Sequence, residues 1–146
     1  MRLQLTRRAD YAVRAVLALA EADRLLPAAE LSRRMQIPPG FLPQIMPGLV
    51  RAGILARSLG RHGGYVLARP SSAISLLEVI EAADAVPAPR SCVLRAGACQ
   101  RERPCAVHPA VANAQEAVRT AFASADFGSL LERRPAAAGM LDGCTR

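Results

Sequence analysis

The first half of the chain carries apolar residues at helical spacing in three stretches. Thr6 is placed to cap a helix that runs to about Glu21 and has a broad apolar face. A shorter helix is predicted over residues 28–35, followed by a proline-rich turn. A third helix is predicted over residues 41–52, and Gly53 stands where a C-terminal cap is expected.

Two short stretches after the third helix are typical of β-strands. They cover residues 54–57 and 65–68, and a basic, glycine-rich tip at 58–64 connects them. The order of helix, helix, turn, helix and hairpin is that of a winged helix-turn-helix, a DNA-binding arrangement. Its recognition helix would lie at about 39–51. The predicted fold class is therefore mainly α, with a small β-hairpin wing and a long C-terminal helix.

The second half of the chain predicts a different arrangement. A helix is expected at about 75–83, and helical spacing returns from His108 to about Ala125. Small apolar residues in the later stretch form an a/d seam, made of Val111, Ala114, Val118, Ala121 and Ala125. The seam predicts close helix packing, either between two copies in a homodimer or against the chain's own domain. The expected units are a winged helix-turn-helix at 1–69, a linker helix at 70–90, a cysteine loop at 91–107, a dimerisation helix at 108–134 and a flexible tail at 135–146.

The positive charge of the chain lies in its first half. The 146 residues include 19 basic and 12 acidic ones, an excess of seven, and every basic residue is arginine. Residues 1–69 hold eleven arginines and four acids, whereas residues 70–146 hold eight of each. This asymmetry favours a polyanion-binding half joined to a half with another role. The apolar runs are too short for a membrane span, and no phosphate loop or carboxylate pair indicates an enzyme, so we expect a cytoplasmic binding protein.

Double-stranded DNA is the polyanion that this fold predicts. Gln44 on the third helix is the expected base reader, because its amide can pair bidentately with adenine. Arginines near the groove would contact phosphates or the minor groove, and glycines would let the wing backbone come close to DNA. These residues are Arg51, Arg57, Arg61, Gly60, Gly63 and Gly64. His62, Arg33 and Arg34 either contact DNA or are ordinary solvated surface residues.

Pro43 and Pro47 depart from the pattern of a recognition helix. A proline lacks an N–H and clashes with the preceding turn, at a cost of about 3 kcal/mol in a helix interior. We therefore expect the helix either to begin late, near Pro43, or to be kinked. Either outcome would alter the specificity or the strength of DNA binding.

Three cysteines in the second half suggest a metal site. Cys92, Cys99 and Cys105 are separated by six and five residues, with four arginines around them. Soft thiolates suit an iron–sulfur cluster or zinc, and the positive charge would offset an anionic cluster. Three thiolates leave one coordination position open or filled by another residue. Structural zinc is the rival, because Cys3His is an accepted zinc set, and Cys144 is expected to be a bystander.

These residues resemble the Rrf family of bacterial winged-helix regulators, typified by IscR, NsrR and RirA. The likeness lies in Met1-Arg2-Leu3, Asp10-Tyr11-Ala12, residues 41–45 and 52–55, the wing at 60–67, the helix at 74–84 and the cysteine loop. The resemblance implies a homodimeric transcription regulator that binds a roughly palindromic operator, with repression as the expected mode. It also implies an iron–sulfur cluster that senses iron, redox or nitric-oxide status.

The resemblance leaves the fourth cluster ligand open. Cys105 and His108 resemble the Cys-x2-His of IscR-type members, in which the histidine completes a 2Fe–2S site. Asp10 matches the acidic position that reaches a 4Fe–4S cluster across the dimer in NsrR-type members. His108 and a 2Fe–2S cluster are favoured because the spacing is local. The rival functions are a zinc-stabilised DNA-binding regulator without redox sensing and a protein–protein adaptor that has lost DNA binding.

Overall fold

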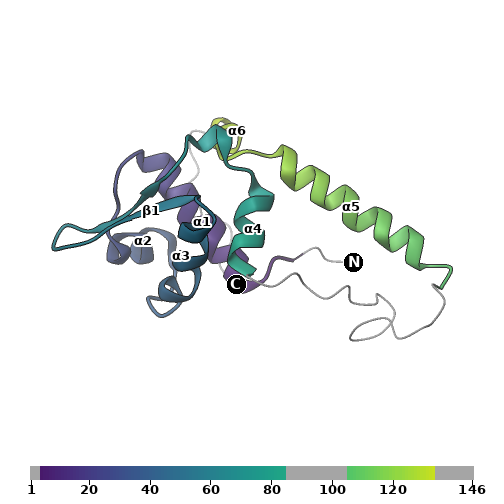
Figure 1. Ribbon diagram of the computed structural model, residues 1–146, viewed down its shortest axis with the longest axis horizontal. Helices are drawn as coiled ribbons and strands as arrows, with labels where there is room; N and C mark the ends of the chain where they lie inside the picture. Colours follow the sequence, from purple (N-terminus) through teal and green to yellow (C-terminus); the bar gives the residue numbers. More distant parts are fainter. Residues whose placement is uncertain (1–3, 85–104, 134–146) are drawn as a thin grey trace.

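The computed structural model describes residues 4–84 and 105–133, and Figure 1 shows how their helices and strands are arranged. A group of helices carries a hairpin that projects from one end, while one long helix extends from the other. The elements in chain order are α1 (Arg7–Ala22), α2 (Ala28–Met35), α3 (Leu42–Arg51), β1 (Leu55–Ser58), β2 (Gly64–Leu67), the 3-10 turn η1 (Ser71–Ala73), α4 (Leu76–Asp84), α5 (His108–Ser124) and α6 (Phe127–Glu132).

The N-terminal elements confirm the predicted winged helix-turn-helix. Thr6 caps α1, since its side chain accepts a hydrogen bond from the N–H of Ala9 at 3.1 Å. Helix α2 covers the residues predicted for it. Gly53 adopts a φ of 67° just after α3, a conformation that glycine reaches without strain. Local caps and apolar spacing thus define the helical part of the fold.

The hairpin is tied to the helices by a third extended segment. Strands β1 and β2 pair antiparallel, with Leu55 opposite Leu67. The loop between α1 and α2 adds Leu26, which exchanges two backbone hydrogen bonds of 2.9 Å with Tyr65. Leu26 and Leu55 are both buried, so the base of the hairpin belongs to the core while its tip projects.

Helix α3 begins later than the expected recognition helix at 39–51. It starts at Leu42, so Pro43 lies in the first turn, where no intrahelical bond requires its missing N–H. Pro47 lies inside the helix, where one backbone hydrogen bond is lost. Of the two expected outcomes, the late start is the one that the structure shows.

The segment 108–134, expected as one helix, contains two. Helix α5 ends at Ser124, and the carboxylate of Asp126 caps α6 by accepting a hydrogen bond from the N–H of Ser129 at 2.8 Å. Phe127 is fully buried in the core, and α6 packs on α1 and η1. Burial of this ring turns the chain back towards α1, which a straight continuation of α5 would not do.

Helix α5 lies largely outside the core. It has no buried residue, and along the seam Val111 and Val118 are half-buried while Ala114 and Ala121 are exposed. The described residues of one chain therefore cover the seam only in part, and the homodimer stays a prediction. No helix within residues 4–84 and 105–133 is long and apolar enough to cross a membrane.

A capping box at the start of α4 connects this helix to the hairpin. The carboxylate of Glu78 accepts hydrogen bonds from the N–H of Ser75 at 2.9 Å and from Arg69 at 3.1 Å. Arg69 also donates to the carbonyls of Gly53 and Ala73, before and after the hairpin. The N–H of Ser75, with further help from Arg69, holds the pKa of Glu78 below its ordinary value. Arg69 thus fixes the exit of β2 against α4.

Acidification is expected to weaken the fold through Glu78. Its folded pKa is below the ordinary value of 4.5, so its ionised form stabilises the fold above that pH. The contribution is lost as the pH falls through the lower folded value. The difference in melting temperature between the parent chain and the Glu78→Gln variant should therefore shrink below about pH 4.5. Glu116→Gln, at an exposed residue of α5, is the control, and a Glu78 effect independent of pH would contradict the assignment.

Candidate nucleic-acid interface and cysteine site

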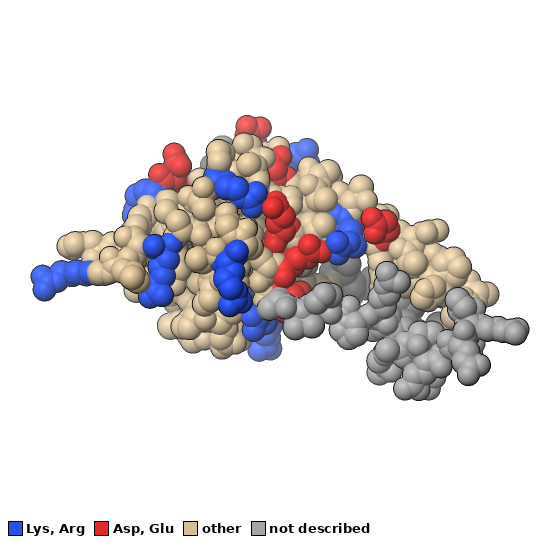
Figure 2. All heavy atoms as spheres, in the orientation of Figure 1, with Lys and Arg blue, Asp and Glu red and all other residues tan. Residues whose placement is uncertain are grey.

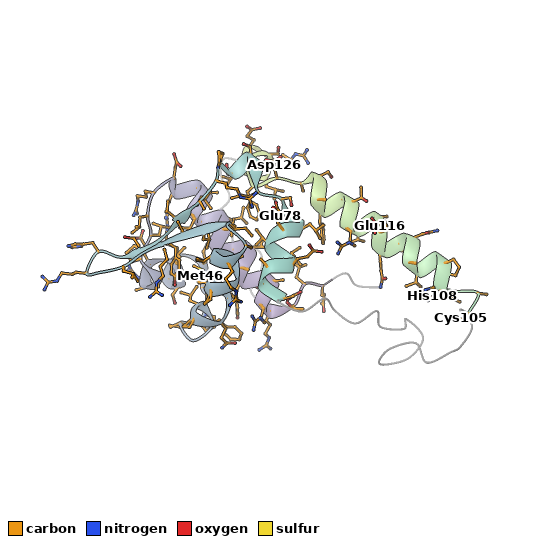
Figure 3. All side chains as sticks on the ribbon, viewed as in Figure 1. Met46, Glu78, Cys105, His108, Glu116 and Asp126 are labelled. Atoms are coloured by element: carbon orange, nitrogen blue, oxygen red, sulfur yellow. The ribbon has the colours of Figure 1, made fainter. Side chains whose placement is uncertain are left out.

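Helix α3 has one buried and one exposed face. The buried side chains are Leu42, Ile45, Met46 and Leu49, and Figure 3 shows Met46 within the group of helices. The exposed side chains are Pro43, Gln44, Pro47 and Arg51. The amide nitrogen of Gln44 donates to the carbonyl of Gly40 at 3.0 Å. This bond orients the amide while leaving its oxygen and one N–H for a base.

The glycines of the hairpin tip serve the fold directly. Gly60 has a φ of 105°, which disfavours any side chain there. A Cβ on Gly63 would lie 2.5 Å from the carbonyl oxygen of Ser58, and one on Gly64 would lie 2.3 Å from that of Leu26. Gly64 is itself buried, so close packing within the hairpin explains Gly63 and Gly64 before any approach to DNA.

The exposed end of the hairpin carries the predicted contacts Arg61 and His62. Between β1 and β2, Leu59 is also exposed, at 77% of its full area. Arg57, on β1, is exposed as well. The projecting hairpin therefore places two arginines and one histidine where a neighbouring polyanion could reach them.

Within the described part of the chain, several exposed arginines on α2, α3 and the hairpin lack the ion pairs that arginines elsewhere in the molecule form. Ion pairs elsewhere join Arg14 to Asp10 at 2.8 Å, Arg24 to Glu30 at 2.8 Å, Arg69 to Glu78 at 3.1 Å and Arg119 to Glu81 at 2.5 Å. In contrast, six exposed arginines have no side-chain hydrogen bond or ion pair with any described residue: Arg7, Arg33, Arg51, Arg57, Arg61 and Arg133. Four of them, Arg33, Arg51, Arg57 and Arg61, lie on α2, α3 and the hairpin. Arg34 lies 3.9 Å from Glu30, a loose pair. Figure 2 shows basic groups extending from the hairpin tip across the helical part beside it.

Arg8 is a positioning residue that the sequence did not reveal. Its Nε donates to the carbonyl of Ala83 at 2.9 Å, and its Nη2 donates to the carbonyl of Gln44 at 3.0 Å. Beside it, the hydroxyl of Thr6 donates to the carboxylate of Asp84 at 2.6 Å. The first turn of α1 therefore joins the exposed helix α3 to the end of α4. The acceptors are backbone carbonyls far away in the sequence, so no local pattern could have indicated them.

The structure describes part of the predicted cysteine site. Cys92 and Cys99 lie outside the described residues, and Figure 3 shows Cys105 and His108 together at the outer end of α5. The N–H of His108 donates to the carbonyl of Cys105 at 2.9 Å, and both residues are half-buried. One backbone turn thus presents a thiol and an imidazole, which are donors that fit an iron–sulfur cluster or zinc.

Asp10, the alternative fourth ligand, already has a partner. Its carboxylate accepts hydrogen bonds from Nε of Arg14 at 3.0 Å and from Nη2 at 2.8 Å. This is the ordinary pairing of opposite charges one turn apart on a helix. Among residues 4–84 and 105–133, no group of three or more His, Cys, Asp or Glu side chains is placed to hold a metal ion.

Comparisons with known proteins agree with this architecture. The model of the Rrf2 family, described as an iron-dependent transcriptional regulator, matches residues 5–133. The transcriptional regulator IscR of Yersinia pseudotuberculosis is 35% identical over 108 residues, which cover 73% of this chain and 65% of IscR. Two solved structures are similar in fold. IscR of T. potens has a TM-score of 0.69 at 20% identity and covers 89% of this chain and 87% of its own. CymR, the global cysteine regulator of B. subtilis, has a TM-score of 0.72 at 20% identity. The match covers 92% of this chain and 100% of the CymR chain.

Proposed function

Because the chain belongs to the Rrf2 family of transcriptional regulators, we propose that it is a homodimeric, cytoplasmic repressor whose operator affinity depends on an iron–sulfur cluster. Members of this family are transcriptional regulators and not enzymes. In the proposed complex, α3 enters the major groove of double-stranded DNA and the hairpin lies against the neighbouring backbone or minor groove. The two copies would read the two halves of a roughly palindromic operator.

One observation carries the DNA-binding part of the proposal. Arg33, Arg51, Arg57 and Arg61 are exposed on α2, α3 and the hairpin and have no internal partner among the described residues. In contrast, Arg14, Arg24, Arg69 and Arg119 form ion pairs, and Arg34 of α2 lies 3.9 Å from Glu30. An arginine without an internal carboxylate keeps its full charge for phosphate oxygens. Four of the eleven arginines of residues 1–69 are therefore free to meet phosphates on the elements that a winged helix presents to DNA.

Replacing Arg51, Arg57 or Arg61 with alanine should weaken binding to every DNA sequence. Each arginine would supply one phosphate contact per subunit, so its loss from both copies of the dimer should reduce the slope of log affinity against log salt by about 1.8, since each contact contributes about 0.9. Fluorescence anisotropy of a labelled duplex, titrated between about 50 and 200 mM salt, measures that slope.

Arg119→Ala is the matched control, because it removes the same charge from a residue that pairs with Glu81 on α4. Its salt slope should equal that of the parent chain. Full binding by Arg61→Ala would show that the hairpin assignment is wrong. A chain without salt-dependent DNA affinity would favour the adaptor function instead.

The proposed cluster ligands are the thiolates of Cys92, Cys99 and Cys105, with His108 as the fourth. His108 is preferred to the partner subunit's Asp10 because it shares a backbone turn with Cys105, whereas Asp10 is bound by Arg14 within its own helix. A 2Fe–2S cluster is accordingly favoured over 4Fe–4S. When bound, a cluster with one ligand that is not a thiolate would supply sensitivity to oxygen, nitric oxide or iron loss.

The residues around α4 offer a physical link between the cluster and DNA. In the sequence, Cys92 follows the end of α4 by eight residues. That end is bound by Thr6 and Arg8, and Arg8 also holds the backbone of Gln44 on α3. A rearrangement of the cysteine segment that displaced Asp84 would therefore disturb contacts that position α3.

Anaerobic purification followed by visible absorption and by iron and sulfide analysis tests the cluster. A coloured protein with iron and sulfide in equal amounts, and an operator affinity that changes on exposure to nitric oxide or an iron chelator, is the expected result. A colourless protein that holds zinc would overturn the cluster. An operator shift unaffected by nitric oxide or chelation would likewise favour the zinc-stabilised regulator.

A further inference from the structure

The exposed face of α3 is unusually apolar for a helix that would enter a DNA groove. At 3.6 residues per turn, Pro43, Pro47, Arg51 and Gln44 fall within an arc of about 100° around the helix axis. All four are exposed, while the opposite face is buried in the core. The two prolines are neighbours at one edge of this arc, and the polar side chains are at the other.

A pyrrolidine ring restricts what such a face can recognise. Proline has neither a side-chain donor nor an acceptor, so a polar base edge pressed against it would lose water without gaining a hydrogen bond. The 5-methyl group of thymine is the apolar feature that the unmodified bases present in the major groove. Contact with thymine methyl groups is therefore the favourable way to cover Pro43 and Pro47.

Gln44 complements this preference. With one N–H held by the carbonyl of Gly40, its amide still offers one donor and one acceptor, which match N7 and the amino group of adenine. Adenine pairs with thymine, so both kinds of contact favour A·T base pairs. The Cα atoms of Pro43 and Pro47 are about 6 Å apart along the helix axis, less than two base-pair steps.

We infer that Pro43 and Pro47 are specificity-determining residues that read thymine methyl groups, next to an adenine read by Gln44. This inference rests on the proposed function, since it requires α3 to lie in the major groove. It gives each half-operator a short A·T-rich segment in which neighbouring thymines present their methyl groups to the helix. The two prolines of α3 thus have a role in recognition.

Uracil substitution in the operator tests this directly. An operator would be selected in vitro with the full-length protein, and each thymine would then be replaced by deoxyuridine, which removes the methyl group and keeps the base pair. Binding should weaken about fourfold at each thymine that contacts a ring, as measured by titration. Alanine is a smaller apolar group than the pyrrolidine ring, so in Pro43→Ala and Pro47→Ala this uracil penalty should shrink at the corresponding positions. Alanine favours a helix, and thermal melting would verify that both variants fold.

Pro70→Ala, at an exposed proline outside α3, is the matched control and should keep the full penalty. Equal affinity of the parent chain for thymine and uracil operators would overturn the inference and leave the proposed function intact. An undiminished penalty in both alanine variants would overturn it as well. Failure to select any operator would overturn this inference and the proposed DNA binding together.

Discussion

Replacing Cys105 with alanine is expected to abolish bound iron and sulfide and to leave a colourless protein. The thiolate at this position would be one of only three in the cluster, and no other cysteine lies among the described residues to replace it. Cys105 sits at the outer end of α5, one turn from His108 and outside the buried core. The substitution should therefore change metal content without unfolding the winged helix, and circular dichroism would verify this.

Cys144→Ala supplies the matched control, because it also removes one cysteine and should keep the colour, iron and sulfide of the parent chain. Retention of full iron and sulfide by Cys105→Ala would contradict the proposed ligand set. Two further variants separate the candidates for the fourth ligand. His108→Ala should alter the visible spectrum, whereas Asp10→Asn should leave it unchanged, and the opposite result would assign the position to the partner subunit's Asp10.

The elements of the winged helix could be predicted from the sequence because local signals and tertiary packing agree there. Thr6 caps α1, and Gly53 takes the positive φ that the end of α3 requires. Local signals and tertiary packing agree less well in the segment that forms α5 and α6. The helical spacing predicted an end near Ala125, and α5 does end at Ser124. The separate helix α6 was not predicted, because it depends on the burial of Phe127 against residues far away in the sequence.

The arginines of the candidate DNA-binding surface could be predicted only in part from the sequence. Exposure of Arg51, Arg57 and Arg61 follows from their places on α3 and the hairpin, so sequence patterns suffice for them. Arg8 and Arg69 contribute equally to the charge of the first half, yet each bonds to backbone carbonyls inside the molecule. Charge counting treats these two kinds of arginine alike. Only the contacts separate arginines that can meet phosphate from those that hold α3, the hairpin and α4 together.

The packing of α3 on α4 depends on Gly48, for which no local sequence pattern indicated a role. A Cβ on Gly48 would lie 2.5 Å from the carbonyl oxygen of Ala82, a backbone atom that a side-chain rotation cannot move. The two helices therefore approach each other more closely than any other residue at this position would permit. Arg8 binds the same pair of helices through Ala83 and Gln44, so α3 is positioned against the end of α4 by two independent contacts.

Gly48→Ala should lower the free energy of unfolding by about 1–3 kcal/mol, because overpacking forces the helices apart. Helix propensity alone would raise the free energy of unfolding, since alanine stabilises a helix interior by about 1 kcal/mol relative to glycine. The sign of the measured change therefore decides whether the close contact exists. Gly40→Ala is the matched control, because its Cβ would meet no atom within 4 Å. Chemical denaturation of both variants measures the two changes in the free energy of unfolding. A Gly48→Ala chain more stable than its parent would contradict the packing.

Because the same contact positions α3, operator affinity should fall in Gly48→Ala under conditions where the variant is still fully folded.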